Sequence, residues 1–177
     1  MSHVLRSDRV VNRRRFLTVS GSGMAAVAGA LILPSTAKAI WPVLREGDVF
    51  VTRNPWNNIV PGYWNHTALY SAGRVYEAQI NPGTIRSVTL GTFRDSYPRI
   101  NILRLHAQYL VPRMVQYAKS LVGKPYTILP YRGGYSCVLY VRASYYYATL
   151  AYRAVDPGWF IPDHIASDNR FVFVGSK

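Results

Sequence analysis

The sequence predicts an α+β fold in which a small antiparallel β-sheet or barrel packs against helices. Short β runs separated by turn residues occupy residues 49–105, two longer runs with helical spacing follow, and one more short β run closes the chain. The chain has 177 residues, 49% of them apolar and 14% aromatic. That length and composition predict one domain with a substantial core and exclude intrinsic disorder and a coiled coil.

The first 39 residues are expected to form a cleavable export signal. Arg13, Arg14 and Arg15 precede an uncharged stretch from Val19 to Leu33, and an Ala-Lys-Ala sequence ends at Ala39. The paired arginines resemble a twin-arginine motif. A membrane span is the weaker interpretation, because this diluted apolar stretch is shorter than the ~20 residues that a helix needs to cross a bilayer. Residues 40–177 are then the exported protein, in the periplasm or otherwise outside the bacterial cytoplasm.

Charge and cysteine content narrow the possible partners and sites. Lys and Arg number 21 against 8 Asp and Glu, a net charge of +13, and residues 40–177 keep an excess of +8. This excess is compatible with an anionic cell wall or membrane surface. Nucleic acid is not expected as a partner, because basic residues do not cluster after residue 40. Cys137 is the single cysteine, which excludes an intramolecular disulfide and a zinc site built on several thiolates.

The β runs come first along the exported chain. They are bounded by Gly, Pro, Asn and Asp, and they cover residues 49–52, 67–70, 74–78, 86–90 and 99–105. The second and third runs are joined by Ser71-Ala72-Gly73, which predicts a hairpin. The fifth alternates apolar and polar residues, as a half-buried strand does.

Two helices are predicted after the strands. Pro112 opens a segment from Arg113 to Val122 with apolar residues at helical spacing, and Gly123 is its expected C′ residue. A breaker-free run from 138 to 154 follows Ser136, which is suited to cap a helix and thereby places Cys137 in the first turn. A turn at 161–163 and a last strand at 171–174 complete the chain.

Cys137 has two interpretations. An unpaired thiol in an oxidising compartment invites a functional explanation, and a helix N-terminus stabilises a thiolate and so lowers the pKa of the cysteine. A buried cysteine that serves only as a small apolar residue is the alternative. A nucleophilic thiol also needs a base, usually a histidine oriented by a third polar group.

His66, His106 and His164 are the candidate bases. His66 lies just before a β run, and Glu77 follows eleven residues later in the next strand of the predicted hairpin. A two- or four-residue turn places both side chains on one face, whereas a three-residue loop separates them. Gln79 is the alternative orienter on the same face as Glu77. A carboxylate among apolar neighbours also needs a partner, which is either His66 or a nearby arginine.

The order of short motifs carries a family resemblance. The motifs are Gly47-Asp48-Val49-Phe50, His66-Thr67-Ala68-Leu69-Tyr70, Val75-Tyr76-Glu77-Ala78, Leu121-Val122-Gly123-Lys124-Pro125-Tyr126, Tyr135-Ser136-Cys137 and Ile161-Pro162-Asp163. In this order they resemble the permuted papain-like amidases of the YaeF/YiiX kind, the circularly permuted branch of the NlpC-type cysteine peptidases. The family often has Ser-Glu after the cysteine, whereas this chain has Val138-Leu139.

The resemblance implies a permuted papain-like fold and a thiol hydrolase. Cys137 would be the nucleophile, His66 the base and Glu77 the residue that orients the imidazole, with no metal or organic cofactor. The backbone N–H of Cys137 would stabilise the oxyanion together with a second donor that the sequence does not assign, for which Tyr135 is the candidate. The implied substrate is an amide bond in a peptidoglycan peptide. The alternatives are lipid acyl hydrolysis or transfer by the same Cys–His pair, and a catalytically silent module that binds wall fragments or lipids.

Overall fold

The described part of the chain forms a mixed α+β fold around one antiparallel sheet. The computed structural model describes residues 41–53, 60–128, 133–152 and 156–177. The six strands lie in the order β4-β3-β2-β1-β5-β6. Their bounds are β1 Val49–Arg53, β2 His66–Ser71, β3 Arg74–Gln79, β4 Thr84–Thr89, β5 Arg99–Leu105 and β6 Phe171–Ser176. The antiparallel sheet expected from the β runs is therefore confirmed.

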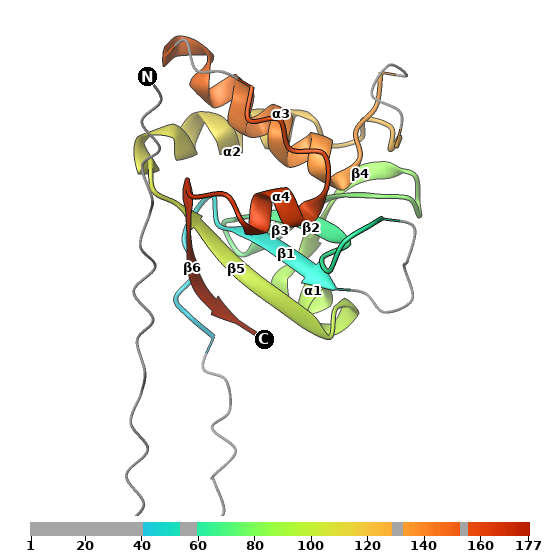
Figure 1. The fold of residues 1–177 in the computed structure, drawn as a ribbon. Helices are drawn as coiled ribbons and strands as arrows, with labels where there is room; N and C mark the ends of the chain where they lie inside the picture. The colour runs from blue at the N-terminus through green and yellow to red at the C-terminus, as the bar shows by residue number, and fades with distance from the viewer. Residues whose placement is uncertain (1–40, 54–59, 129–132, 153–155) are drawn as a thin grey trace, which may run out of the picture. The chain divides into compact units, whose positions relative to one another are not determined.

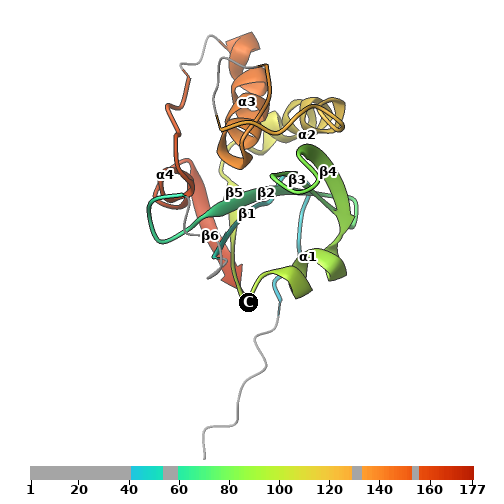
Figure 2. The ribbon, with the colours of Figure 1, turned by 90° about the vertical axis from the view of Figure 1, so that its right-hand side faces the viewer.

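Helices cover both faces of this sheet, as Figures 1 and 2 show. Helices α2 (Val111–Ser120) and α3 (Cys137–Thr149) lie together on one face, and α1 (Leu90–Ser96) lies on the other. Strand alternation supplies apolar side chains to both faces. In β1, Val49 and Val51 belong to the cluster that includes α2 and α3, while Phe50 between them packs with Phe93 of α1. The sheet is thus buried on both sides at its centre.

Helix α3 begins at the residue predicted for it. The Ser136 side chain accepts a hydrogen bond from the Leu139 N–H at 3.2 Å, so Ser136 is the N-cap and Cys137 lies in the first turn. The helix is anchored to the sheet at the same end, because the Thr67 hydroxyl donates to the Cys137 carbonyl at 2.9 Å. This contact fixes the start of α3 against β2.

Two short helices depart from the prediction. Helix α1 follows Thr89, which caps it by accepting the Thr92 N–H at 3.1 Å, and α4 (Pro162–Ala166) replaces the turn expected at 161–163. Helix α3 also stops before 154: it ends at Thr149 and continues as a 3₁₀ turn over Leu150–Tyr152. Residues 153–155 and the expected export signal at 1–39 lie outside the described residues. Within that part, no helix is both long enough and apolar enough to span a bilayer.

Candidate active site

The β2–β3 hairpin places His66 and Glu77 on one face, as the sequence predicts. Ser71 pairs with Arg74 across a two-residue turn, and Ala68 pairs with Glu77. Both turn residues have positive φ, 48° at Ala72 and 76° at Gly73, as a type I′ hairpin requires. His66, two residues before Ala68, is therefore the diagonal neighbour of Glu77 on the same face.

His66 and Glu77 form a buried ion pair. The His66 Nε2 atom lies 2.8 Å from Glu77 Oε2, and the two residues are only 6% and 1% exposed. Because Nε2 faces the carboxylate, Nδ1 is the ring nitrogen left for the hydrogen bond between His66 and the Cys137 thiol. The three side chains therefore form one chain from thiol to imidazole to carboxylate.

Other polar groups hold Glu77 in place. Arg86 of β4 donates to Oε1 from Nε at 3.0 Å and from Nη2 at 2.8 Å. Oε2 also accepts from the Tyr97 hydroxyl at 3.2 Å and from Gln79 Nε2 at 3.1 Å. Both partners expected for Glu77, His66 and an arginine, are thus present, and Gln79 supports the carboxylate rather than replacing it.

Tyr97 also fixes the imidazole plane. Its ring stacks on His66 with a centroid separation of 5.2 Å and an angle of 9° between planes. Burial first, and then the negative charge of Glu77, raise the pKa of Tyr97 far above its ordinary value, so its hydroxyl stays a donor. His66 is therefore held at its edge by Glu77 and at its face by Tyr97.

The Cys137 thiol is buried yet electrostatically favoured as a thiolate. Cys137 is 5% exposed, and burial alone would raise its pKa. The hydrogen bond and charge of His66, with the N–H groups of Thr67 and Val138, outweigh burial, so the pKa of Cys137 lies below its usual value. The helix N-terminus that supplies the Val138 N–H is the feature that the sequence predicts for this residue.

The pKa values of His66 and Glu77 shift in the directions that favour the charged form of each group. Burial would lower the pKa of His66, but the hydrogen bonds and charges of Cys137 and Glu77 together outweigh it and raise the pKa to about 9. Burial would raise the pKa of Glu77, but its bonds to His66, Gln79 and Arg86 and the His66 charge lower the pKa to about 2. The shifts of all three groups therefore point toward the form of the site with a thiolate, an imidazolium and a carboxylate.

Cys137 lines a small, mostly apolar cavity of about 190 Å³. Its described lining, apart from Cys137, consists of Val60, Pro61, Tyr126, Ile128, Ser136, Val138, Phe160 and Ile161. This described lining contains no charged side chain. Burial, and then the negative charge of Cys137, raise the pKa of Tyr126, so its hydroxyl remains a protonated donor beside the thiol.

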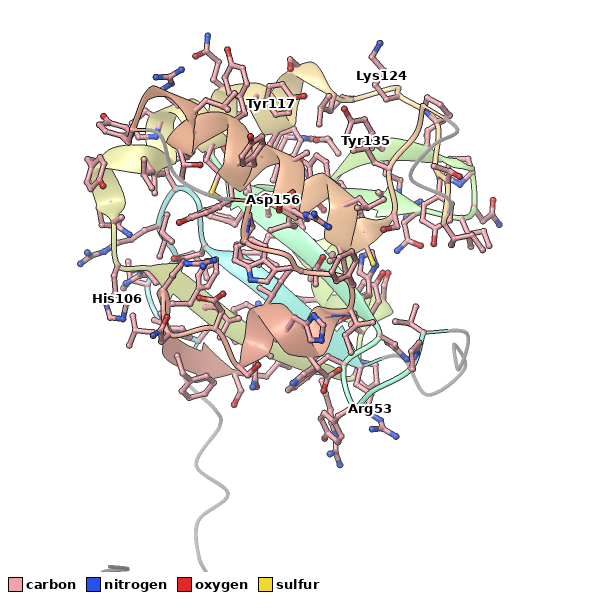
Figure 3. All side chains as sticks on the ribbon, turned by 45° about the horizontal axis from the view of Figure 1, so that its top comes forward. Arg53, His106, Tyr117, Lys124, Tyr135 and Asp156 are labelled. Atoms are coloured by element: carbon pink, nitrogen blue, oxygen red, sulfur yellow. The ribbon has the colours of Figure 1, made fainter. Side chains whose placement is uncertain are left out.

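Tyr135, the expected second oxyanion donor, lies elsewhere. Its side chain is hydrogen-bonded with Tyr117 of α2, and Figure 3 shows the two labelled residues near one another at the α2 side of the molecule. It lines a separate cavity of about 260 Å³ with Leu139 and Arg142. Burial, followed by the Tyr117 contact, raises the pKa of Tyr135 to about 12. Tyr135 therefore lines a different cavity from the one beside Cys137, which Tyr126 lines.

The other two histidines lie outside the site. His106 directly follows β5 and is exposed, and Figure 3 shows it at the margin of the molecule. His164 is exposed on α4, where its Nδ1 accepts a hydrogen bond from the Phe160 N–H at 3.4 Å. The structure thus brings together His66, Glu77 and Cys137 from the predicted residues.

Glu77→Gln is expected to slow acylation and to lower its alkaline limit, which is the pH above which the acylation rate falls because His66 loses its proton. The amide keeps an acceptor but loses the charge that helps to raise the pKa of His66 to about 9. The imidazolium is then lost at a lower pH, and we expect a rate loss of about 10- to 100-fold, on the order of 1.4 to 2.7 kcal/mol. Single-turnover acylation by an activated ester across pH measures both effects. A folded variant with an unchanged rate and limit would assign the orienting role to another group, Gln79 first.

Arg86→Gln is expected to move the alkaline limit in the opposite direction. Arg86 compensates the charge of Glu77 through its contacts to Oε1. Without it, Glu77 stabilises the imidazolium more strongly, so the pKa of His66 rises and the limit moves to higher pH. Arg74→Gln is the matched control, because Arg74 bonds Ser87 rather than Glu77. A limit that moved downward, or moved equally in both variants, would contradict this account of Arg86.

Comparison with known proteins adds a likeness in fold. The chain is similar to the crystal structure of the metalloprotein YiiX from Escherichia coli O157:H7, with a TM-score of 0.58 and 15% sequence identity. The match covers 75% of this chain and 97% of that one. At this identity the likeness concerns the fold alone, and in that respect the resemblance seen in the motifs is confirmed. No family model and no curated protein matches the chain.

Proposed function

We propose that this protein is an exported cysteine hydrolase with a permuted papain-like arrangement, which cleaves an amide or ester through an acyl-enzyme on Cys137. The observation that carries the proposal is the buried chain of thiol, imidazole and carboxylate at the start of α3. Its members have pKa values shifted toward the ion-pair form that a nucleophilic thiolate requires. The resemblance in motif order and in fold to YiiX supports the same assignment.

Acylation begins with attack of the Cys137 thiolate on the substrate carbonyl carbon. The carbonyl π electrons move to oxygen, which becomes an oxyanion. The N–H of Cys137 is suited to bind that oxyanion, because first-turn N–H groups have no partner within their own helix. The Tyr126 hydroxyl, which lines the same cavity, is our candidate for the second donor.

Collapse of this intermediate breaks the bond to the leaving group. The His66 imidazolium gives its proton to the leaving nitrogen or oxygen, the amine or alcohol departs, and a thioester remains on Cys137. Neutral His66 then takes a proton from water, which attacks the thioester. The acid leaves, and the thiolate–imidazolium pair is restored. Glu77 holds the ring in place throughout.

The apolar cavity bears on the choice between two substrate classes. An amide in a peptidoglycan peptide is the first class implied by the motifs, and a lipid acyl bond is the second. The described lining beside Cys137 is aliphatic and aromatic apart from Ser136, and it offers no charged partner for the charged side chains of a wall peptide. This observation favours an apolar acyl group next to the thiol, and therefore the second class.

The residues present do not fit a metal centre, although YiiX is described as a metalloprotein. Both oxygens of Glu77 already accept hydrogen bonds, and His66 Nε2 faces one of them. Among residues 41–53, 60–128, 133–152 and 156–177, no three His, Cys, Asp or Glu side chains are grouped to hold an ion. Only His66 Nδ1 and the Cys137 thiol would remain as ligands, and we derive no step through a metal.

Product analysis tests the proposal and the substrate choice together. Residues 40–177 are incubated separately with purified muropeptides and with phospholipids, and products are identified by mass spectrometry, with Cys137→Ala as the control. We expect Cys137-dependent release of fatty acid, or acyl transfer, from the phospholipids. Cleavage of muropeptides alone would return the assignment to the wall amidase. No Cys137-dependent product and no thioester with an activated ester would favour the binding module.

A further inference from the structure

Two arginines face each other at the ends of β1 and β5. Arg53 and Arg99 are direct partners in the antiparallel register of these strands. Like charges placed directly opposite each other destabilise a sheet. Neither guanidinium forms an ion pair with any of the described carboxylates. Two uncompensated positive charges in this position do not stabilise the sheet. Their presence therefore favours a role other than stability.

Tyr63 holds both guanidinium groups. The Arg53 guanidinium carbon lies 4.5 Å from the Tyr63 ring centroid, and its Nη1 donates to the Tyr63 carbonyl at 3.3 Å. Arg99 Nη1 donates to the Tyr63 hydroxyl at 2.6 Å. Within the described part of the chain, these contacts use one nitrogen of each arginine and leave its other N–H donors for a ligand. The two cations are thus oriented before any ligand arrives.

A cavity lies between these side chains. It measures about 440 Å³ and is lined by Arg53, Tyr63, Pro98 and Arg99. Figure 3 shows Arg53 beyond the end of the sheet, on the side away from α2 and Tyr117. The carboxylate of Asp163 is bonded to this segment, because its oxygens accept the N–H groups of Tyr63 and Trp64 at 3.1 and 3.0 Å. That carboxylate is occupied by the backbone and makes no ion pair with either arginine.

We propose that Arg53, Arg99 and Tyr63 form a binding site for a phosphate group. The planar guanidinium presents paired N–H donors that match the oxygens of phosphate. Inorganic phosphate or a phosphate monoester carries about −1.5 to −2 charges at neutral pH and so compensates both arginines, whereas a carboxylate or a phosphodiester compensates one. The Tyr63 hydroxyl adds a third polar group at the same cavity.

The site is connected to the catalytic cavity through the chain itself. Tyr63 lies three residues before His66, and Val60 and Pro61 line the cavity beside Cys137. A bound phosphate would therefore lie next to the segment that leads into the catalytic histidine. The inference does not depend on hydrolysis, because binding can be measured on a protein that lacks the thiol.

Phosphate titration of the Cys137→Ala protein tests the site. Inorganic phosphate is added at constant low ionic strength, and binding is followed by calorimetry and by NMR shifts. We expect saturable binding that weakens at least tenfold in Arg53→Gln with Arg99→Gln. The matched control is Arg113→Gln with Lys119→Gln, which removes the same charge from two other cations that lie over tyrosine rings. Arg99→Lys, which keeps the charge without the paired donors, is expected to bind with intermediate strength.

The source of the phosphate is resolved by two further arms. Glycerol phosphate and vesicles that contain phosphatidic acid, whose phosphate is a monoester, replace inorganic phosphate, with phosphatidylcholine vesicles as reference. Binding of the vesicles that depends on Arg53 and Arg99 identifies a lipid headgroup, and binding of the small phosphates alone identifies a soluble ligand. Equal weakening in both double variants, or no saturable binding by the parent protein in any arm, would overturn the proposal.

Discussion

Cys137→Ala is expected to abolish acyl-enzyme formation. The thiolate is the nucleophile of the proposed acylation step, and no other cysteine exists in the chain to replace it. Attack by water without the thiol leaves only the contribution of the oxyanion donors and of substrate binding, so we expect a rate loss of at least about 10³-fold. Single-turnover reaction with an activated ester, read by the intact protein mass, measures the loss directly.

The fold should survive this substitution. Cys137 is packed in the core cluster at the start of α3, but the helix cap belongs to Ser136 and the anchor to β2 uses the Cys137 backbone. Removing one sulfur therefore costs little packing, on the order of 1 kcal/mol. A Cys137→Ala protein with an intact thermal transition that still forms a covalent acyl adduct would contradict the nucleophile assignment.

His66→Ala is expected to have the second largest effect. The thiol then loses the hydrogen bond and the charge that lower its pKa, while its burial remains. The leaving group also loses its proton donor, and general acid–base catalysis contributes about 10²- to 10⁴-fold. We expect the acylation rate to fall by about 10²- to 10⁴-fold or more. The residual rate should increase toward high pH, because the thiol then ionises without His66.

His106→Ala and His164→Ala are the matched controls for this prediction. Both remove an imidazole from an exposed position outside the site, so neither should change the acylation rate. Because His66→Ala leaves Glu77 buried beside Arg86, its thermal transition is compared with that of the parent protein. A folded His66→Ala protein with the parent rate, or a loss in either control, would assign the base to a different residue.

Much of the fold can be predicted from local sequence patterns. Alternating residues predict β5 at its observed bounds, and the breaker residues at Ser71–Gly73 predict the hairpin. The two short helices, α1 and α4, cannot be predicted from such patterns. Helix α1 spans seven residues and includes Gly91, and α4 spans five and starts at a proline, so neither contains enough turns to display a helical period. Their existence depends on packing of Phe93 and Ile165 into the two cores.

Only those features of the candidate site that depend on local sequence patterns can be predicted from the sequence. The pairing of His66 with Glu77 follows from strand alternation, and the position of Cys137 follows from the Ser136 cap. Tyr97 could not be predicted, because it follows α1 and reaches the imidazole only through the tertiary fold.

The positions of Tyr126 and Tyr135, the two candidates for a second oxyanion donor, also depend on tertiary contacts. Tyr126 and Tyr135 are joined by an isolated bridge between their backbones, yet Tyr126 lies beside the thiol and Tyr135 contacts Tyr117. The contact of Tyr135 with Tyr117 of α2 separates the two side chains, and this contact cannot be inferred from a local pattern.

The pH dependence of Cys137 alkylation tests the central claim most directly. A free thiol reacts with a rate that follows a pKa near ~8.5, whereas a thiolate paired with His66 should still react rapidly near pH 6. The account predicts a rate in the parent protein that is nearly constant from about pH 6 to 8, and a loss of the acidic part of this plateau in His66→Ala. A parent rate that follows an ordinary or raised thiol pKa, unchanged by His66→Ala, would contradict the claim that Cys137 is an activated nucleophile.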